Sequence, residues 1–280
     1  MANTLSSSIL LDALSDRVIT TLGNKLAPLN AFSKDFSTDN MAQNTSVQVK
    51  KFSSTSAIQT NPSNFESGDT TGTNVNVLIK HYSKSFTLTS QELNSRYKLD
   101  QLADINLQVV ANKIMDVALT PIDATNFPTN VTVAQTSFVA ANVKTLWAAA
   151  AKSSVKNLVL DSVAYAQLLP TTMTDIGARS GYAGFDGVYL NTRWTGAGTN
   201  VYGFACGPEA IAVVGGIPMI DPTVAGLLAA SKVITIEGLG LSVQINTWGS
   251  LSSRSAWASF DVMFGAALGD NTAVARCISA

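Results

Sequence analysis

The feature that most constrains this chain is an apolar periodicity between residues 89 and 119. Thr89 and Glu92 have the spacing of a capping box at its start, and Pro121 stops it. The pattern predicts one helix about 45 Å long, a beam for other elements to lie across. The large apolar side chains expected on its buried face follow at spacings of three to five and are Leu93, Tyr97, Leu102, Ile105, Val109, Ile114 and Val117.

Charged residues are unusually sparse. Of the 280 residues 13% are charged and 46% are hydrophobic, whereas soluble domains average about 25% charged residues. So few charges cannot cover the surface, and we expect much of it to meet other protein. The net charge of -1 predicts no strong generic attraction to nucleic acid. Cys206 and Cys277 are too few and too distant for a disulfide framework, and we expect buried, reduced thiols.

The N-terminal region has a second helical pattern. Apolar residues recur every four positions through residues 9–29, which Pro28 closes, and they are Leu10, Leu14, Val18, Leu22 and Leu26. This helix has no neighbour in sequence, so it must dock on a distant segment or on another chain. No signal peptide is visible, and the longest uncharged apolar run, 210–220, is too short to span a membrane.

Residues 45–88 read as a long β-hairpin. Val47, Val49 and Phe52 alternate with polar residues, and a second strand runs from Val75 to Phe86 with a break near His81. The intervening residues 53–74 are rich in Ser, Thr, Asn and Gly. A two-stranded hairpin this long is marginal alone in water, so it needs a neighbour.

The rest of the chain mixes short helices and strands. A helix over 137–152, with Phe138, Val139, Val143, Leu146 and Trp147 inward, precedes a buried strand over 156–160. Asp161 or Ser162 then caps a short helix, and 209–214 is expected as a short helix or turn. The further predicted strands are 188–190, 202–206, 232–236, 241–248, 256–265 and 274–278.

Residues typical of a catalytic or metal site are missing from the sequence. His81 is the single histidine, and a lone histidine on a strand is far more often a surface residue than a ligand. Glu66 and Asp69 lie in a polar hairpin tip, where solvated charges are a better interpretation than an acid–base pair. Neither a nucleophile elbow nor a phosphate-binding loop occurs. The sequence therefore predicts no enzyme, no cofactor and no metal.

The order of these elements resembles the major capsid proteins of tailed bacteriophages of the Hong Kong 97 type. Three phrases add to the resemblance: 156–161 with 165–170 resembles the entry to the family's axial domain, 207–212 its later helix, and 260–278 its closing strands. The resemblance implies an α+β fold. Its expected parts are an N-terminal arm (1–44), an extended E-loop hairpin (45–87), a peripheral domain with the spine helix (88–152), an axial domain (153–250) and returning peripheral strands (251–280).

The resemblance also implies a function. Copies would assemble as pentamers and hexamers into an icosahedral shell in the host cytoplasm, enclosing double-stranded DNA that they contact non-specifically. A separate scaffolding protein and a portal would be partners, decoration proteins remain an open question, and no membrane is involved. The arm would lie under another subunit. The residues expected in assembly contacts are Lys50, Lys51, Phe65, Glu66, Asp69, Lys80 and Lys84.

Two alternatives remain open. An encapsulin-like bacterial compartment shares this fold and encloses an enzyme, and the absence of an obvious cargo-docking groove near the arm favours the phage protein over it. An intracellular α+β hydrolase needs a clustered polar site, which the sequence does not supply.

Overall fold

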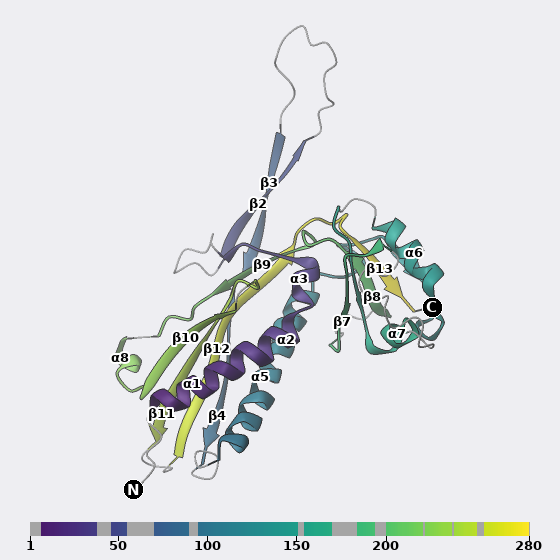
Figure 1. Ribbon diagram of the computed structural model, residues 1–280. Coiled ribbons are helices and arrows are strands. Elements are labelled where there is room, and N and C mark those ends of the chain that lie inside the picture. Colours follow the sequence, from purple (N-terminus) through teal and green to yellow (C-terminus); the bar gives the residue numbers. More distant parts are fainter. Residues whose placement is uncertain are drawn as a thin grey trace.

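The computed structural model describes residues 7–37, 46–54, 70–89, 95–150, 154–169, 184–193, 200–220, 222–236, 238–250 and 255–279. Figure 1 shows an elongated body with two β-sheets side by side and a two-stranded ribbon that projects away from it. Helices and strands are mixed in both halves of the body, which confirms the predicted α+β class.

The larger half is built on a six-stranded sheet of order β1-β9-β12-β11-β10, with β4 on the other edge of β12. β12 organises the sheet, because β4 pairs along it from Ala256 to Phe264 while β11 and then β9 take consecutive parts of its opposite edge. The predicted strands at 232–236, 241–248 and 256–265 are confirmed here. The strand bounds are Ser33–Asp35 (β1), Lys80–Leu88 (β4), Ile211–Gly216 (β9), Ala230–Ile236 (β10), Leu241–Ser250 (β11) and Ser255–Leu268 (β12).

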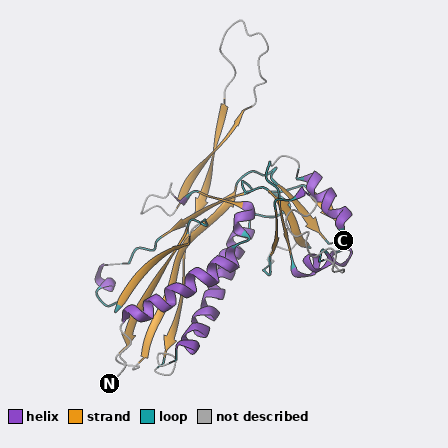
Figure 2. Ribbon diagram, in the orientation of Figure 1, coloured by secondary structure: helices purple, strands orange, loops and turns teal. Residues whose placement is uncertain are grey.

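Helices cover one face of this sheet (Figure 2). The N-terminal helical run comprises α1 (Ser7–Arg17), a π-helical turn (Val18–Leu22) and α2 (Gly23–Leu26), and it is followed by α3 (Leu29–Phe32). The predicted four-residue periodicity is confirmed, since all five of its apolar side chains are buried. The run packs against α5 (Arg96–Leu119) and the sheet of its own chain, in one continuous apolar core. Residues 9–29 are therefore docked on a distant segment of their own chain, which is the first of the two possibilities that the sequence left open.

The long helix α5 differs from its prediction in two ways. It begins at Arg96 after an extended Ser95, and the predicted cap residue Glu92 lies outside the described residues. The expected buried face was wrong for Tyr97, Ile105 and Val109, whose exposed fractions are 70%, 63% and 48%. The buried face carries small and polar residues as well as large ones, and the small residues let the sheet and α1 approach the helix closely. It is made by Leu99, Ala103, Asn106, Leu107, Val110, Ala111, Ile114, Met115, Ala118 and Leu119.

The smaller half is a five-stranded sheet of order β5-β13-β8-β6-β7. Its strands are Asn130–Thr132 (β5), Asn157–Leu160 (β6), Gly187–Leu190 (β7), Val201–Cys206 (β8) and Val274–Ile278 (β13), and its helices are the 3₁₀ turn Gln135–Ser137, α6 (Ala140–Ala149) and α7 (Ser162–Gln167). β6 is buried along its whole length between two neighbours, as predicted. Asp161 caps α7 by accepting a hydrogen bond from the Ala164 amide at 2.9 Å.

Two predictions were wrong, one in each half of the body. Residues 209–214, expected as a helix or turn, contain a turn at 208–210 and then strand β9, because Ile211–Gly216 fits between β1 and β12. Just before and within α6, Phe138, Val143 and Leu146 are buried as expected, but Val139 and Trp147 are exposed.

The two sheets run across the domain boundaries that the sequence suggested. β10 and β11, expected in an axial domain at 153–250, belong to the six-stranded sheet beside α5. β13, expected among returning peripheral strands, completes the five-stranded sheet. The chain therefore crosses between the two halves more often than a linear division implies.

Candidate assembly surfaces

The projecting ribbon consists of β2 (Ser46–Ser54) and β3 (Thr70–Leu78), paired antiparallel from Ser46 with Leu78 to Ser54 with Thr70. Among the described residues of the ribbon, those at its base are anchored in the body. There Val47, Val49, Val77 and Ile79 pack with Ala212 and Val214 of β9 in a small apolar cluster. Further out, Gly72, Thr73 and Asn74 are exposed, and the ribbon stands clear of both sheets (Figure 1).

The ribbon leaves the sheet at a single residue. Ile79 separates β3 from β4, so the break falls two residues before the predicted position at His81. β12 passes close beneath this point, because a Cβ on Gly265 would lie 2.4 Å from the Leu78 carbonyl oxygen. A glycine is required for that crossing, where β4 pairs within the six-stranded sheet and β3 does not.

An open groove of about 720 Å³ lies against the six-stranded sheet. Its wall is largely apolar and comes mainly from the segment between β9 and β10, which includes α8 (Pro222–Ala225). Met219 and Leu227 in this wall are among the most exposed apolar side chains of the described chain. The lining residues are His81, Pro218, Met219, Ile220, Val224, Leu227, Leu228, Gln244, Asn246, Trp248, Gly249, Ser259 and Asp261.

The floor of this groove is a polar network that crosses neighbouring strands. Asn246 Nδ2 donates to Asp261 Oδ2 at 2.9 Å, Ser259 donates to the same oxygen, and His81 Nε2 lies 3.2 Å from Asp261 Oδ1. Gln244 Nε2 donates to Ser231 Oγ at 3.1 Å. Sequence reasoning missed this network, although the alternation of Gln244 and Asn246 with the buried residues Val243 and Ile245 signals a strand with two different faces.

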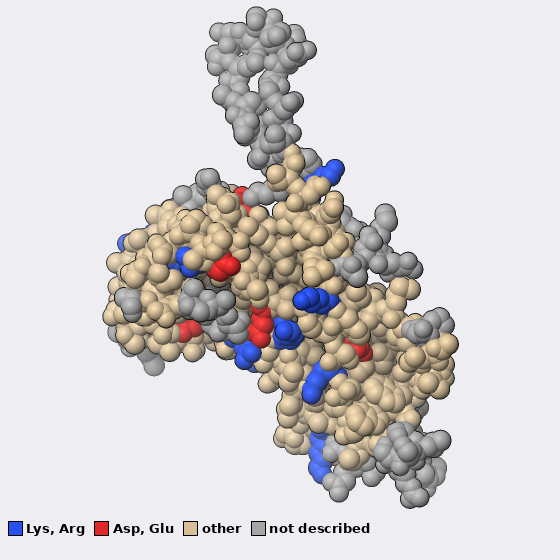
Figure 3. Space-filling view, turned by 180° about the vertical axis from the view of Figure 1, so that it is seen from behind, with Lys and Arg blue, Asp and Glu red and all other residues tan. Residues whose placement is uncertain are grey.

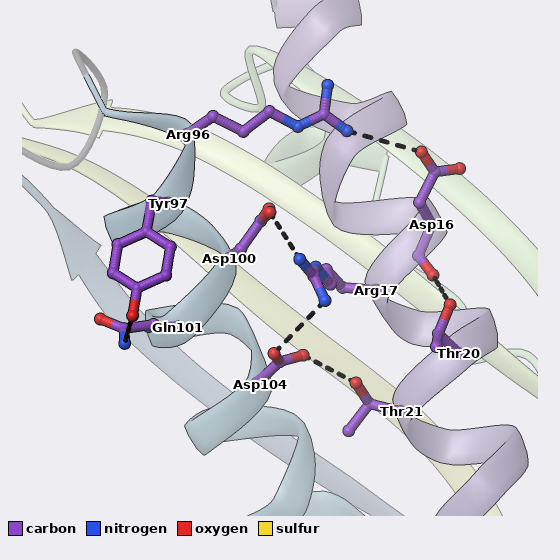
Figure 4. Close-up of polar contacts among 9 residues, drawn as sticks. All are labelled: Asp16, Arg17, Thr20, Thr21, Arg96, Tyr97, Asp100, Gln101 and Asp104. Atoms are coloured by element: carbon purple, nitrogen blue, oxygen red, sulfur yellow. Dashed lines mark hydrogen bonds and ion pairs between the residues drawn. The ribbon is translucent and has the colours of Figure 1, made fainter.

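Polar contacts hold the N-terminal helices on α5 (Figure 4). Arg17 donates to Asp100 Oδ2 at 2.6 Å and lies 3.6 Å from Asp104, while the Thr21 hydroxyl donates to Asp104 Oδ1 at 2.7 Å. The second ion pair, Arg96 with Asp16 at 3.8 Å, is far more exposed. α5 also exposes Tyr97, Ile105 and Val109 at four- to eight-residue spacings, which leaves an apolar stripe on its outer side.

No protein-family model matches the chain, and no curated protein matches it. Solved structures do match along almost its whole length. A virus-like particle from Pyrococcus furiosus gives a TM-score of 0.54 at 10% identity and covers 95% of this chain and 98% of that one. The capsid of a native gene-transfer-agent particle also gives 0.54, at 11% identity, and covers 100% and 93%. A chain of Mycobacterium phage Ogopogo gives 0.54 at 13% identity and covers 91% of each chain.

The chain has the Hong Kong 97-type capsid fold. In the terms of this fold, the β2–β3 ribbon is the E-loop hairpin and α5 is the spine helix. The E-loop is shorter than the predicted range 45–87, because β4 belongs to the six-stranded sheet.

The expected contact residues fall in three places relative to this fold. Lys50 is exposed on the E-loop, and Lys51 lies on β2 with a side chain outside the described residues. Lys80 is exposed and Lys84 is half-buried on β4, so these two lysines were wrongly assigned to the hairpin. None of Lys50, Lys80 and Lys84 forms an ion pair with a described carboxylate. Phe65, Glu66 and Asp69 lie outside the described residues.

Both cysteines of this capsid fold are free and buried, as predicted. The Cys277 thiol donates to Tyr202 Oη at 3.0 Å, and Tyr202 in turn donates to the Val133 carbonyl at 2.9 Å. Burial raises the pKa of Cys277 to about 11 and raises the pKa of Cys206 well above its ordinary value. These thiols are therefore neutral packing groups in the five-stranded sheet.

Two findings concern metal sites and membrane-spanning helices. Within the described residues, no group of three His, Cys, Asp or Glu side chains is placed to hold a metal ion. None of the helices in that part of the chain has the length and apolarity needed to cross a membrane.

Proposed function

We propose that this chain is the major capsid protein of a tailed bacteriophage, which self-assembles into an icosahedral shell around packaged double-stranded DNA. The observation that carries the proposal is the E-loop: a nine-residue strand pair whose base is buried and whose outer part extends past its own subunit. Two strands alone are marginal in water. A neighbouring copy in a shell supplies the surface on which they lie.

The sparse charge supports the same proposal. Only 13% of residues are charged, and Figure 3 shows one face of the molecule on which scattered basic and acidic side chains are surrounded by uncharged residues. Such a surface suits a subunit that meets its neighbours edge to edge. Contacts of the head-to-tail kind close into rings, and many modest contacts for each subunit give a stable shell through avidity.

Specific contacts can be assigned within this proposal. Lys50 and Lys51 on the E-loop, together with Lys80 and Lys84 beside its base, pair with carboxylates of the adjacent subunit. Phe65, Glu66 and Asp69 at the tip make contacts with that same neighbour. Each exposed ion pair contributes only about 0.2–1 kcal/mol, so register in the shell depends on their number rather than on any one of them.

The proposed assembly takes place in the host cytoplasm with a separate scaffolding protein and a portal. The protein is a structural component rather than an enzyme, and it requires no cofactor. An encapsulin-like compartment is the second candidate, because a virus-like particle is among the similar structures with a TM-score above 0.5. Particle contents separate the two: nuclease-resistant DNA supports the phage capsid, and a single enclosed protein supports the compartment.

The test is a subunit with a shortened E-loop. Lys51 and Thr73 face each other across the ribbon, so an Asn-Gly turn can replace residues 52–72 and close the hairpin above its buried base. We expect this variant to fold with unchanged near-ultraviolet circular dichroism but to stay in small oligomers by sedimentation and electron microscopy. The full chain at the same concentration should form rings or shells. Normal shells from the shortened subunit would show that the ribbon is not an intersubunit arm.

A further inference from the structure

A second, smaller pocket lies where the two halves of the body meet. Its volume is about 280 Å³, roughly the space of nine waters in the liquid. One wall comes from α2 and α5 beside the six-stranded sheet, and the other from the end of β7 in the five-stranded sheet. The lining residues are Asn24, Lys25, Pro28, Ala111, Asn112, Met115, Leu190, Asn191, Thr192 and Arg193.

The wall of this pocket contains a buried hydrogen-bond donor with nothing to bond. Asn191 is 3% exposed, and its Oδ1 accepts a hydrogen bond from the Arg193 amide at 3.0 Å. Its Nδ2 has no partner among the described residues. Leaving a buried donor unsatisfied destabilises the fold, so its persistence needs an explanation.

The other polar groups around the pocket include further donors. Lys25 and the Asn112 amide have no hydrogen-bond or ion-pair partner within the described chain. Arg193 donates to Asp116 through Nε at 3.2 Å and through its terminal nitrogen at 3.0 Å, which fixes the guanidinium at the rim. The lining therefore holds two cations, of which Arg193 is paired with Asp116 and Lys25 is not, and it holds no carboxylate.

We infer that this pocket binds a phosphate group, with Lys25, Asn191 and Arg193 as its donors. A ligand with several acceptor oxygens and negative charge satisfies the orphaned amide and the unpaired ammonium together. The lining offers a cation no carboxylate, and an apolar molecule would leave both donors unsatisfied. Because the donors come from both halves of the body, a bound phosphate also ties those halves together.

The phosphate can come from two sources, inorganic phosphate or the backbone of nucleic acid. The pocket lies within one chain, so its occupancy can be measured whether or not shells form. Failure to bind phosphate would leave the proposed capsid function untouched.

The experiment compares Lys25→Ala with Lys98→Ala in the full chain. Lys25 and Lys98 are both exposed, but Lys98 lies on α5 away from the pocket lining. Thermal unfolding is followed in sodium phosphate and in sodium chloride at equal pH and ionic strength. We expect phosphate to raise the Tm of the wild type and of K98A. The apparent phosphate affinity of K25A should fall about tenfold, because one charge-assisted hydrogen bond is lost.

A second variant, Asn191→Asp, keeps the Oδ1 acceptor for the Arg193 amide and removes the donor. It should abolish the phosphate effect, while its Tm in chloride reports whether it folds. If a short DNA duplex competes with inorganic phosphate for the pocket, the site binds the backbone of nucleic acid. If the duplex does not compete, the site binds free phosphate. The inference would be overturned if the wild-type Tm were equal in phosphate and chloride. It would also be overturned if K25A and K98A lost the same amount of phosphate affinity.

Discussion

The E-loop and the helical layer on the six-stranded sheet differ in how they bury their apolar residues. Each has an apolar stripe that must leave water. The helices α1 and α5 bury theirs against β10–β12 and against each other, within one chain. The E-loop buries only its first residues, around Val47 and Val77, and then extends beyond its own subunit.

This difference separates folding from assembly. The helical layer supplies the stability of the isolated subunit, so its residues are constrained by the chain's own core. Within the proposed capsid function, the outer E-loop instead serves the contact with a neighbouring subunit. Substitutions in the first region should change folding, and substitutions in the second should change assembly alone.

The largest effect should come from the buried face of α5. Leu107 is fully buried, whereas Ile105 on the same helix is 63% exposed. Leu107→Asp places an unpaired charge in the core and should prevent folding, a loss above about 4 kcal/mol. Ile105→Asp should change stability by less than about 0.5 kcal/mol. Circular dichroism and urea unfolding measure both, and an unfolded I105D would mean that the outer side of α5 is core.

The same helix shows what the sequence could not supply. Large apolar residues predicted its existence and its end, but the choice of face depended on what packs there. Ala103, Ala111 and Ala118 face the core because α1 and the sheet approach closely, and Asn106 is tolerated there because its amide donates to the Leu102 carbonyl at 2.7 Å. A pattern that scores only bulky side chains therefore includes the buried Ile114 together with the exposed Ile105 and Val109.

The next effect is a loss of stability in alkali. The pKa of Cys277 is raised by burial from 9.0 to about 11, so the folded state keeps a proton that the unfolded chain releases above pH 9. This contribution is complete below pH 9 and is lost as pH rises to about 11. Each such thiol steepens the decline by about 1.4 kcal/mol per pH unit. Urea unfolding measured across this pH range should show that the stability of Cys277→Ala falls less steeply with pH than that of the wild type, with Cys206 still contributing. Equal slopes would mean that the Cys277 thiol is not shielded from solvent as described.

The base of the E-loop marks where the self-supported part of the ribbon ends. Val77 is fully buried against β9, while its neighbour Asn76 is exposed. Val77→Ala should destabilise the subunit by about 2 kcal/mol, and Asn76→Ala should be neutral within about 0.5 kcal/mol. Equal effects in chemical denaturation would mean that the base is not anchored as described.

Sheet membership was the other limit of sequence reasoning. The strands 202–206 and 274–278 were predicted at nearly their observed bounds, but short apolar runs do not specify their partners. The run Ile211–Gly216 shows this, because its six residues form a strand only through β1 and β12, which are distant in sequence. The groove floor and the phosphate pocket were missed for the same reason, since each gathers residues from segments far apart in the chain.

The smallest effect should come from the ion pairs that clamp α1 to α5. Arg17 contacts both Asp100 and Asp104 in a partly buried setting, whereas Arg96 and Asp16 are both mostly exposed. Arg17→Ala should therefore speed amide hydrogen exchange in α1 more than Arg96→Ala does, with the core of α5 unchanged. High salt should reduce the effect of Arg96→Ala proportionally more than that of Arg17→Ala, because screening weakens the more exposed pair first. Equal exchange rates in the two variants would mean that apolar packing alone holds the N-terminal helices on α5. Ion pairs would then contribute nothing to the difference between this helical layer and the E-loop.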